Sequence, residues 1–217
     1  FELTVASSGW NEKRLIAAKR NYLAVHSHPA SHAGYFPGAQ GMSLKLLVDP
    51  TTQKILGVQG VGKDGVDKRI DVIATAMRAG MTAPELADLE LAYAPPFGSA
   101  KDPVNMLGYI SENALSGITP TVQWHEVEAK VAEGFSVLDV RSVGEVDRGT
   151  LPGAKNLPID EIRERKEEIP TGKILVTCQV GQRGHVATML LRSLGYDAKN
   201  LDGGYLTWIN SPAANLK

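Results

Sequence analysis

The second half of the chain is organised around residues 173–194, which read KILVTCQVGQRGHVATMLLRSL. Residues 174–177 are short, apolar or β-branched, and they predict a buried strand. Apolar residues after Cys178 recur at helical spacing and predict a helix; they are Ala187, Leu190, Leu191 and Leu194. The stretch therefore predicts a strand, a tight polar loop and a helix, with the only cysteine of the chain at the end of the strand.

This position favours a reactive thiol at Cys178. Unpaired backbone N–H groups at the start of a helix carry partial positive charge and stabilise an anion such as a thiolate. Gly181 and Gly184 let the loop curl so that successive N–H groups point inward, and Arg183 adds a permanent charge. The alternative is an inert core thiol, since cysteine is among the most buried residue types. The glycine-rich loop and Arg183 lead us to favour catalysis.

Residues Cys178 to Arg183 resemble the active-site loop of rhodanese sulfurtransferases. Other motifs of that family occur in the same order along the chain, namely Val137-Leu138-Asp139-Val140-Arg141, Glu145, GTLPGAKNLP at 149–158 and LDGGYLTW at 201–208. One position departs from the family pattern, because many relatives have His-Ile where this chain has Thr150-Leu151. Cysteine phosphatases are the nearest rival, but their loop is one residue longer between cysteine and arginine, which suits a phosphate rather than a persulfide sulfur.

The resemblance assigns roles to individual residues. It implies that Cys178 is the catalytic nucleophile and that Asp139 and Arg141 brace the loop. It also implies a loop that binds the persulfide and the substrate, made of Gln179, Val180, Gly181, Gln182 and Arg183.

Composition sets broad limits on the protein. The chain has 217 residues, room for one large or two modest domains, and a formal net charge of −1 that suggests neither a nucleic-acid nor a membrane partner. No apolar run is long enough to span a bilayer, no signal peptide is visible, and a single cysteine excludes an internal disulfide. We therefore expect a cytoplasmic protein. Because Phe1 already lies in a strand-like stretch, we also expect a piece of a longer protein.

The order of the predicted elements separates two halves at the stiff connection 119–121. The first half is predicted to contain strands at 1–8, 22–28, 42–48 and 55–61 and helices beginning at Asn11 and at 67–79, 82–86 and 101–115. The second alternates helices at 124–132 and 159–166 with strands, which argues for a mostly parallel sheet. We predict an α+β domain over residues 1–117 and an α/β domain over residues 118–217.

The first half resembles the dimerisation domain of pyridine nucleotide-disulfide oxidoreductases, in the branch of coenzyme A-disulfide reductases, NADH oxidases and polysulfide reductases. The matching stretches are residues 1–6, 28–35 and 93–105. The resemblance implies a homodimer formed through this domain. It also places Tyr35 and Tyr93 at the reductase site of the partner subunit, where a phenol can donate a proton or hold an anion. Packing at an interface is the alternative for both tyrosines.

We expect the redox cofactors to bind to other domains of a longer parent protein rather than to this chain. We identify no Gly-x-Gly-x-x-Gly fingerprint behind a strand and no second cysteine, so we expect neither flavin nor pyridine nucleotide on this chain. The resemblance implies FAD, NAD(P)H and coenzyme A for a parent protein with N-terminal FAD and NAD domains. His26, His28 and His32 are loosely spaced, and no carboxylate or cysteine joins them, so we expect no metal.

The sequence thus predicts a rhodanese-type sulfurtransferase that moves sulfur from small donors to thiol acceptors. The alternative is a non-catalytic module for dimerisation and for sulfur sensing or docking.

Overall fold

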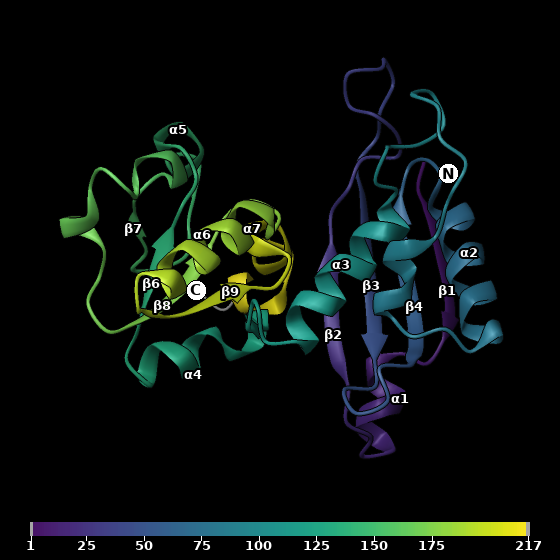
Figure 1. The fold of residues 1–217 in the computed structure, drawn as a ribbon, viewed down its shortest axis with the longest axis horizontal. Helices are drawn as coiled ribbons and strands as arrows, with labels where there is room; N and C mark the ends of the chain where they lie inside the picture. The colour runs from purple at the N-terminus through teal and green to yellow at the C-terminus, as the bar shows by residue number, and fades with distance from the viewer. Residues whose placement is uncertain (1, 216–217) are drawn as a thin grey trace. The chain divides into compact units, whose positions relative to one another are not determined.

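The computed structural model describes residues 2–215 and divides into two compact units, Phe1–Leu115 and Ser116–Lys217 (Figure 1). The first unit is α+β with an antiparallel sheet, and the second is α/β with a parallel sheet, so the predicted fold class is confirmed. The prediction for Phe1 lies outside the described residues. No helix within residues 2–215 combines the length and the apolar character needed to cross a membrane.

The first unit is built on a four-stranded sheet in the order β1-β4-β3-β2, with every neighbouring pair antiparallel. Its strands are β1 (Thr4–Gly9), β2 (Leu23–Ser27), β3 (Met42–Val48) and β4 (Ile55–Gly62). The strands predicted at 42–48 and 55–61, which the turn signal at 49–52 joins into an expected hairpin, form the antiparallel pair β3 and β4. Asp49 shapes its turn, because the carboxylate accepts the N–H groups of Thr51 and Thr52 at 3.0 Å each.

The helices of this unit are α1 (Glu12–Ala17), α2 (Val66–Ala79) and α3 (Pro103–Leu115), with a 3₁₀ turn η1 at Pro84–Asp88. Asn11 caps α1 as predicted, since its side chain accepts the N–H of Arg14. The sequence also suggests Thr82 as the cap of the helix predicted at 82–86, and this is wrong. The carboxylate of Glu85 instead accepts from the N–H and the hydroxyl of Thr82, at 2.6 and 2.7 Å, and the following segment makes only a 3₁₀ turn.

The spacing Gly-x-Gly-x-x-Gly is in fact present at Gly60, Gly62 and Gly65, between β4 and α2, contrary to the sequence interpretation. The structure shows a packing role for it. β4 lies in an antiparallel sheet rather than in a βαβ unit, and a Cβ on Gly60 would come within 2.8 Å of the side chains of Leu44 and Val66. Gly60 thus lets α2 lie close to the sheet, whereas Gly62 lies against Met42 of β3 and Gly65 against the side chain of Arg69. This is not the geometry of a dinucleotide-binding turn.

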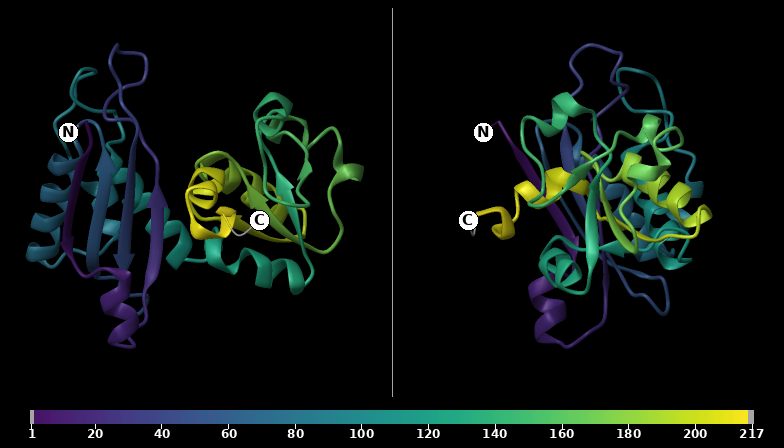
Figure 2. Two further views of the ribbon diagram at one scale, coloured as in Figure 1. Left: turned by 180° about the vertical axis from the view of Figure 1, so that it is seen from behind. Right: turned by 90° about the vertical axis from the view of Figure 1, so that its left-hand side faces the viewer.

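α2, α3 and η1 cover one face of the sheet and enclose the larger core of the unit. Ile70, Ile73 and Leu107 from the helices pack there against Leu44 and Leu46 of β3. On the other face α1 covers a smaller cluster of Leu15, Ala24, Leu47 and Leu56. Two long loops, residues 28–41 and 93–102, extend from this framework, and both are visible in Figures 1 and 2.

The second unit contains a five-stranded sheet in the order β5-β9-β8-β6-β7, in which all paired strands are parallel. The strands are β5 (Thr121–Val122), β6 (Phe135–Asp139), β7 (Lys155–Asn156), β8 (Lys173–Thr177) and β9 (Asp197–Leu201). A parallel sheet needs cover on both faces. The helices α4 (Val127–Ala132), α6 (Gln182–Ser193) and α7 (Gly204–Ile209) pack against its strands. The other helical elements of the unit are η2 (Trp124–Glu126), α5 (Val143–Val146), η3 (Ile159–Glu161), η4 (Lys166–Glu168) and η5 (Pro212–Asn215).

The two faces of this sheet have separate cores. Ala187 and Leu191 of α6 pack with Ile174 and Val176 on one face, and Trp208 of α7 packs with Leu175 on the other. The helix predicted at 159–166 is wrong, because the chain forms only the short turns η3 and η4 there. That segment is mostly charged, and only two of its residues, 159 and 162, are apolar, too few to hold a helix against the sheet.

Candidate functional site

Cys178 lies at the carboxyl end of β8, directly after Thr177 and before the first turn of α6. Its side chain is 0 % exposed and belongs to the core cluster under α6. The N–H of Gly181 donates to the sulfur at 3.2 Å. The predicted strand, loop and helix are therefore confirmed, and the thiol accepts from the N–H of the residue that directly precedes α6.

Gly181 is the residue that lets the loop curl. It has φ +91° and precedes α6 directly, a left-handed conformation that L side chains rarely adopt. Gly184 does not belong to the loop that it was predicted to help curl, because it lies inside α6. A Cβ there would come within 2.2 Å of Oδ1 of Asn200 and 3.7 Å of Sγ of Cys178, so this glycine allows the helix to approach the thiol and β9.

The loop is fastened to the start of α7. The N–H groups of Tyr205 and Leu206 donate to the carbonyls of Cys178 and Gln179 at 2.7 and 2.9 Å. Gly204 must be a glycine at this contact, because its φ is +62° and a Cβ would lie 2.5 Å from the carbonyl oxygen of Cys178. These contacts explain physically why LDGGYLTW, residues 201–208, accompanies the cysteine loop in the sequence.

Asp139 and Arg141 form a buried ion pair beneath the loop. The guanidinium donates to the carboxylate through Nε at 3.0 Å and through NH2 at 2.7 Å, and the two side chains are 0 % and 2 % exposed. Arg141 also donates to the side chain of Gln179 at 3.1 Å and to the carbonyl of Gly149 at 2.7 Å. Arg141 thus contacts the loop directly through Gln179, and Asp139 acts on the loop only by holding Arg141.

Two further residues complete this frame. The hydroxyl of Thr150 donates to Asp139 at 2.6 Å, and the ring of Tyr205 lies 4.3 Å from the guanidinium carbon of Arg141. Thr150 is the position where the sequence departs from the family pattern. In the structure its hydroxyl donates one of the hydrogen bonds that the buried carboxylate of Asp139 accepts. The sequence interpretation assigned no role to either residue.

Arg183 was expected to contribute a permanent charge beside the thiol. In the structure this charge is paired with a carboxylate. Its guanidinium donates to both carboxylate oxygens of Glu145, at 2.5 and 2.7 Å. The N–H and hydroxyl of Ser142 also donate to Glu145, at 3.1 and 2.9 Å. The hydrogen bond from Arg183, assisted by those from Ser142, lowers the pKa of Glu145 to about 2.

Glu145 is a residue that sequence reasoning saw only as part of a family motif. The signal that could have found its local role is the pattern Ser142-x-x-Glu145, which predicts a capping box, and the structure contains that box. Its pairing with Arg183, 38 residues away, could not have been found from local sequence.

His185 and Asn200 flank the loop on the side of α6 and β9. Nδ1 of His185 lies 2.6 Å from the hydroxyl of Thr119, and burial lowers the pKa of this histidine. The amide of Asn200 donates to the carbonyl of Gly181 at 3.0 Å. The Asn200 bond holds the loop backbone at Gly181, and the His185 contact joins α6 to the segment that precedes β5.

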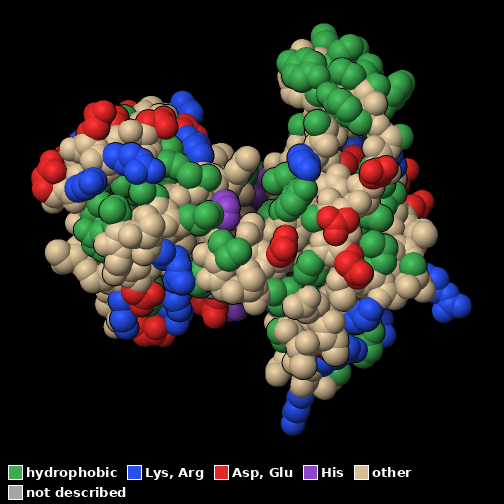
Figure 3. All heavy atoms as spheres, in the orientation of Figure 1, with side chains coloured by type: hydrophobic (Ala, Val, Ile, Leu, Met, Phe, Trp, Pro, Cys, Tyr) green, Lys and Arg blue, Asp and Glu red, His purple; other side chains and the backbone are tan. Residues whose placement is uncertain are grey.

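The other predicted pair, Tyr35 and Tyr93, comes together in the first unit. Their hydroxyl oxygens lie 2.9 Å apart, although the residues come from different long loops. The hydrogen bond with Tyr35 raises the pKa of Tyr93 above its ordinary value. Exposed apolar side chains surround the pair at the loop tips, where Figure 3 shows hydrophobic groups gathered; these are Phe36 and Phe97 together with Tyr35 itself, which is 76 % exposed.

A second buried ion pair holds the two tyrosine loops at their base. Arg69 donates to Asp102 at 2.9 Å, and both side chains are almost fully buried. The same guanidinium donates to the carbonyl of Ser31 at 2.7 Å, so one arginine on α2 binds both loops. A backbone hydrogen bond from Ala33 to Gly98 joins the loops directly at 2.8 Å.

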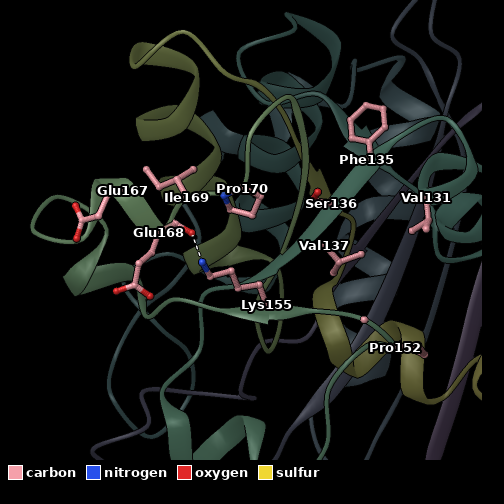
Figure 4. Close-up of a pocket in the computed structure, with 11 residues that line it drawn as sticks. Val131, Phe135, Ser136, Val137, Pro152, Lys155, Glu167, Glu168, Ile169 and Pro170 are labelled. Carbon is pink, nitrogen blue, oxygen red and sulfur yellow. Dashed lines mark hydrogen bonds between the residues drawn. The ribbon is translucent and has the colours of Figure 1, made fainter.

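A shallow pocket of about 460 Å³ lies elsewhere on the second unit (Figure 4). It is lined by the start of β6, from Phe135 to Val137, and by residues 167–170, and the ammonium of Lys155 donates there to the carbonyl of Glu168. The first residues of β6 pair with the first residues of β8, whereas Cys178 follows the last residue of β8. The pocket therefore belongs to the other end of the strands from the thiol.

Comparison with protein families agrees with this division of the chain. Residues 1–103 match the family described as the pyridine nucleotide-disulphide oxidoreductase dimerisation domain, and residues 123–211 match the rhodanese-like domain. The chain thus joins a member of the first family to a member of the second, and the resemblances found in the sequence are confirmed.

Individual proteins similar to this chain include two solved structures and a curated reductase. The crystal structure of reduced Bacillus anthracis CoADR-RHD is 48 % identical, with a TM-score of 0.94, over 96 % of this chain and 38 % of that chain. The NAD-dependent persulfide reductase from A. fulgidus is 39 % identical, with a TM-score of 0.86 and the same coverage. The coenzyme A disulfide reductase of Staphylococcus haemolyticus is 42 % identical over 109 residues, which are 50 % of this chain and 24 % of that protein. The chain spans about a quarter of the length of the curated relatives that it matches.

Proposed function

We propose that the second unit is a sulfurtransferase in which Cys178 carries a persulfide. The observation that supports this most is the position of its sulfur, at the end of β8, in contact with the N–H of Gly181 at the start of α6. A backbone N–H just before a helix can donate a hydrogen bond to a sulfur anion held there. The similarity to a persulfide reductase over nearly the whole chain agrees with the proposal.

In the proposed reaction the Cys178 thiolate attacks the outer sulfur of a donor, such as a polysulfide, an organic persulfide or thiosulfate. A sulfur–sulfur bond forms to Cys178, and the donor's own bond to that sulfur breaks. The leaving group departs with the electron pair, as a thiolate or as sulfite. The N–H groups from Gln179 to Arg183 hold the terminal sulfur anion. An acceptor thiolate, or cyanide in an assay, then takes that sulfur and restores the Cys178 thiolate.

We further propose that the parent protein is an FAD- and NAD(P)H-dependent disulfide reductase that dimerises through the first unit. In it coenzyme A would accept the sulfur, and Tyr35 and Tyr93 would face the reductase site of the partner subunit. The residues of this chain do not fit the dinucleotides, because the one Gly-x-Gly-x-x-Gly spacing serves helix packing. Those cofactors would bind to other parts of the parent. Since the cycle returns Cys178 to a free thiol, a reducing compartment such as the cytoplasm suits it.

The direct test is the variant Cys178→Ala in an assay of thiocyanate formation from a sulfur donor and cyanide. We expect activity to fall to background, because no other group on the chain can carry the sulfur covalently in this scheme. Thermal melting should change little, since the substitution removes one small buried atom and one hydrogen bond. Activity close to that of the wild type would refute the proposal. It would leave the alternative, a module for dimerisation and for sulfur sensing or docking, in which Cys178 transfers no sulfur.

A further inference from the structure

Glu145 controls the charge that Arg183 presents to the cysteine loop. Both terminal nitrogens of the Arg183 guanidinium donate to the Glu145 carboxylate, at nitrogen–oxygen distances of 2.5 and 2.7 Å. Glu145 is itself fixed by its two contacts with Ser142 and is only partly exposed. The pair is therefore a held, bidentate one rather than a mobile surface contact.

The other cation of the loop is also neutralised. Arg141 forms its bidentate pair with Asp139, and both side chains are buried. The two guanidinium groups at the loop are thus matched one to one by carboxylates. The donor that contacts the sulfur itself is the backbone N–H of Gly181, directly before α6. Such N–H groups suit a single charge on sulfur.

We propose that Glu145 determines which sulfur donors the loop accepts, by withholding the charge of Arg183 from them. This inference rests on the sulfurtransferase function proposed above. A donor whose outer sulfur is carried on a thiol brings one negative charge to the loop. Thiosulfate brings two negative charges. Neither Arg141 nor Arg183 has an unpaired guanidinium to bind the second charge. Glu145 thereby favours organic persulfides over thiosulfate, and it acts through Arg183 as a positioning residue.

The low pKa of Glu145 agrees with this role. Because the value is about 2, the folded protein keeps this carboxylate ionised at every pH used to assay sulfur transfer. The compensation of Arg183 is therefore permanent under those conditions.

The test compares two donors in the cyanide assay, thiosulfate and the persulfide of 2-mercaptoethanol, with Cys178→Ala as the blank. Glu145→Gln keeps an acceptor for Ser142 but loses the charge that holds Arg183. We expect its kcat/KM for thiosulfate to rise about tenfold, chiefly through KM, with little change for the persulfide. The gain should shrink as salt is added. Glu145→Asp retains the charge and should keep the preference of the wild type.

Two controls separate charge from structure. Glu161→Gln removes a carboxylate from another ion pair with an arginine, Arg165, and should alter neither donor. Adding Arg183→Gln to Glu145→Gln should cancel the gain with thiosulfate. Should Glu145→Gln fail to fold, the wild type still gives a measurement, because its kcat/KM for thiosulfate should depend only weakly on ionic strength.

The possible outcomes are distinct. No selective gain with thiosulfate in Glu145→Gln, or a steep salt dependence in the wild type, would overturn the assignment of Glu145 and leave sulfur transfer standing. Transfer from neither donor by the wild type would overturn the proposed function and this inference with it.

Discussion

The tyrosine pair of the first unit and the cysteine loop of the second are both built on a buried arginine–aspartate pair. Arg69 and Asp102 hold the base of the tyrosine loops, and Arg141 and Asp139 hold the base of the cysteine loop. What lies above each pair differs. The side chain of Tyr35 is 76 % exposed, whereas that of Cys178 is fully buried.

This difference separates an exposed pair of side chains from a buried one. The cysteine loop has its thiol, the N–H group that donates to it and the supporting ion pairs within one unit. On the proposed function, that thiol is the nucleophile. The tyrosine loops present aromatic side chains outward, and exposed apolar patches of this kind mark surfaces that bind another protein. The first site therefore fits a role in assembly, and the second fits chemistry.

The largest expected effect comes from breaking either buried pair. Arg141→Met and Arg69→Met each leave an aspartate buried without its partner, which should cost about 3–5 kcal/mol of stability. Urea unfolding of the whole chain measures this loss. Only Arg141→Met should also abolish sulfur transfer, because only that arginine contacts the cysteine loop.

The control for this pair of variants is Arg165→Met, whose ion pairs with Glu161 and Glu168 are exposed on the surface. It should cost no more than about 1 kcal/mol. If Arg141→Met were as mild as this control, the buried pair would not be what supports the loop.

A smaller effect concerns Glu145 and pH. Its pKa in the folded chain is about 2, below the ordinary value of 4.5, so its contribution to stability is fully present above pH 4.5 and is lost as the pH falls toward 2. The difference in urea midpoint between wild type and Glu145→Gln should therefore be greatest near pH 6 and should shrink by pH 3. A difference that stays constant over this range would contradict the ion pair with Arg183.

The smallest effect is expected at the tyrosines. Tyr35→Phe removes one exposed hydrogen bond and should change stability by no more than about 0.5 kcal/mol. It should also lower the pKa of Tyr93 toward its ordinary value, because the hydrogen bond between the two hydroxyls is the main cause of the raised pKa. NMR titration of the labelled tyrosine rings would measure this. An unchanged pKa would show that the two hydroxyls do not interact in solution.

The sequence was informative where a local pattern has only one physical reading. A short apolar run, a cysteine and two glycines before a helical pattern predicted the strand, loop and helix around Cys178. Asn11 likewise identified the start of α1. The sequence was misleading where a pattern has several readings. Residues 159–166 were predicted to form a helix, but this charged segment has too few apolar residues to build one. The Gly-x-Gly-x-x-Gly spacing at 60, 62 and 65 was not identified, and in the structure these glycines serve packing.

The contacts between distant residues were not accessible from the sequence. Arg183 looked like a free charge behind the thiol, and only the folded chain brings Glu145 against it. Thr150 looked like a departure of no consequence, and it donates to the buried carboxylate of Asp139. Local chemistry can be inferred from residue types, but the pairing of charges depends on tertiary packing.

The most direct test of the account is the mass of the chain after exposure to an organic persulfide, followed by peptide mapping. The account predicts that the wild type gains one sulfur atom, located on the peptide that contains Cys178, and that cyanide removes it. A Cys178 that gains no sulfur and also resists alkylation in the folded chain would contradict the account, because the thiol would then be only a buried part of the core.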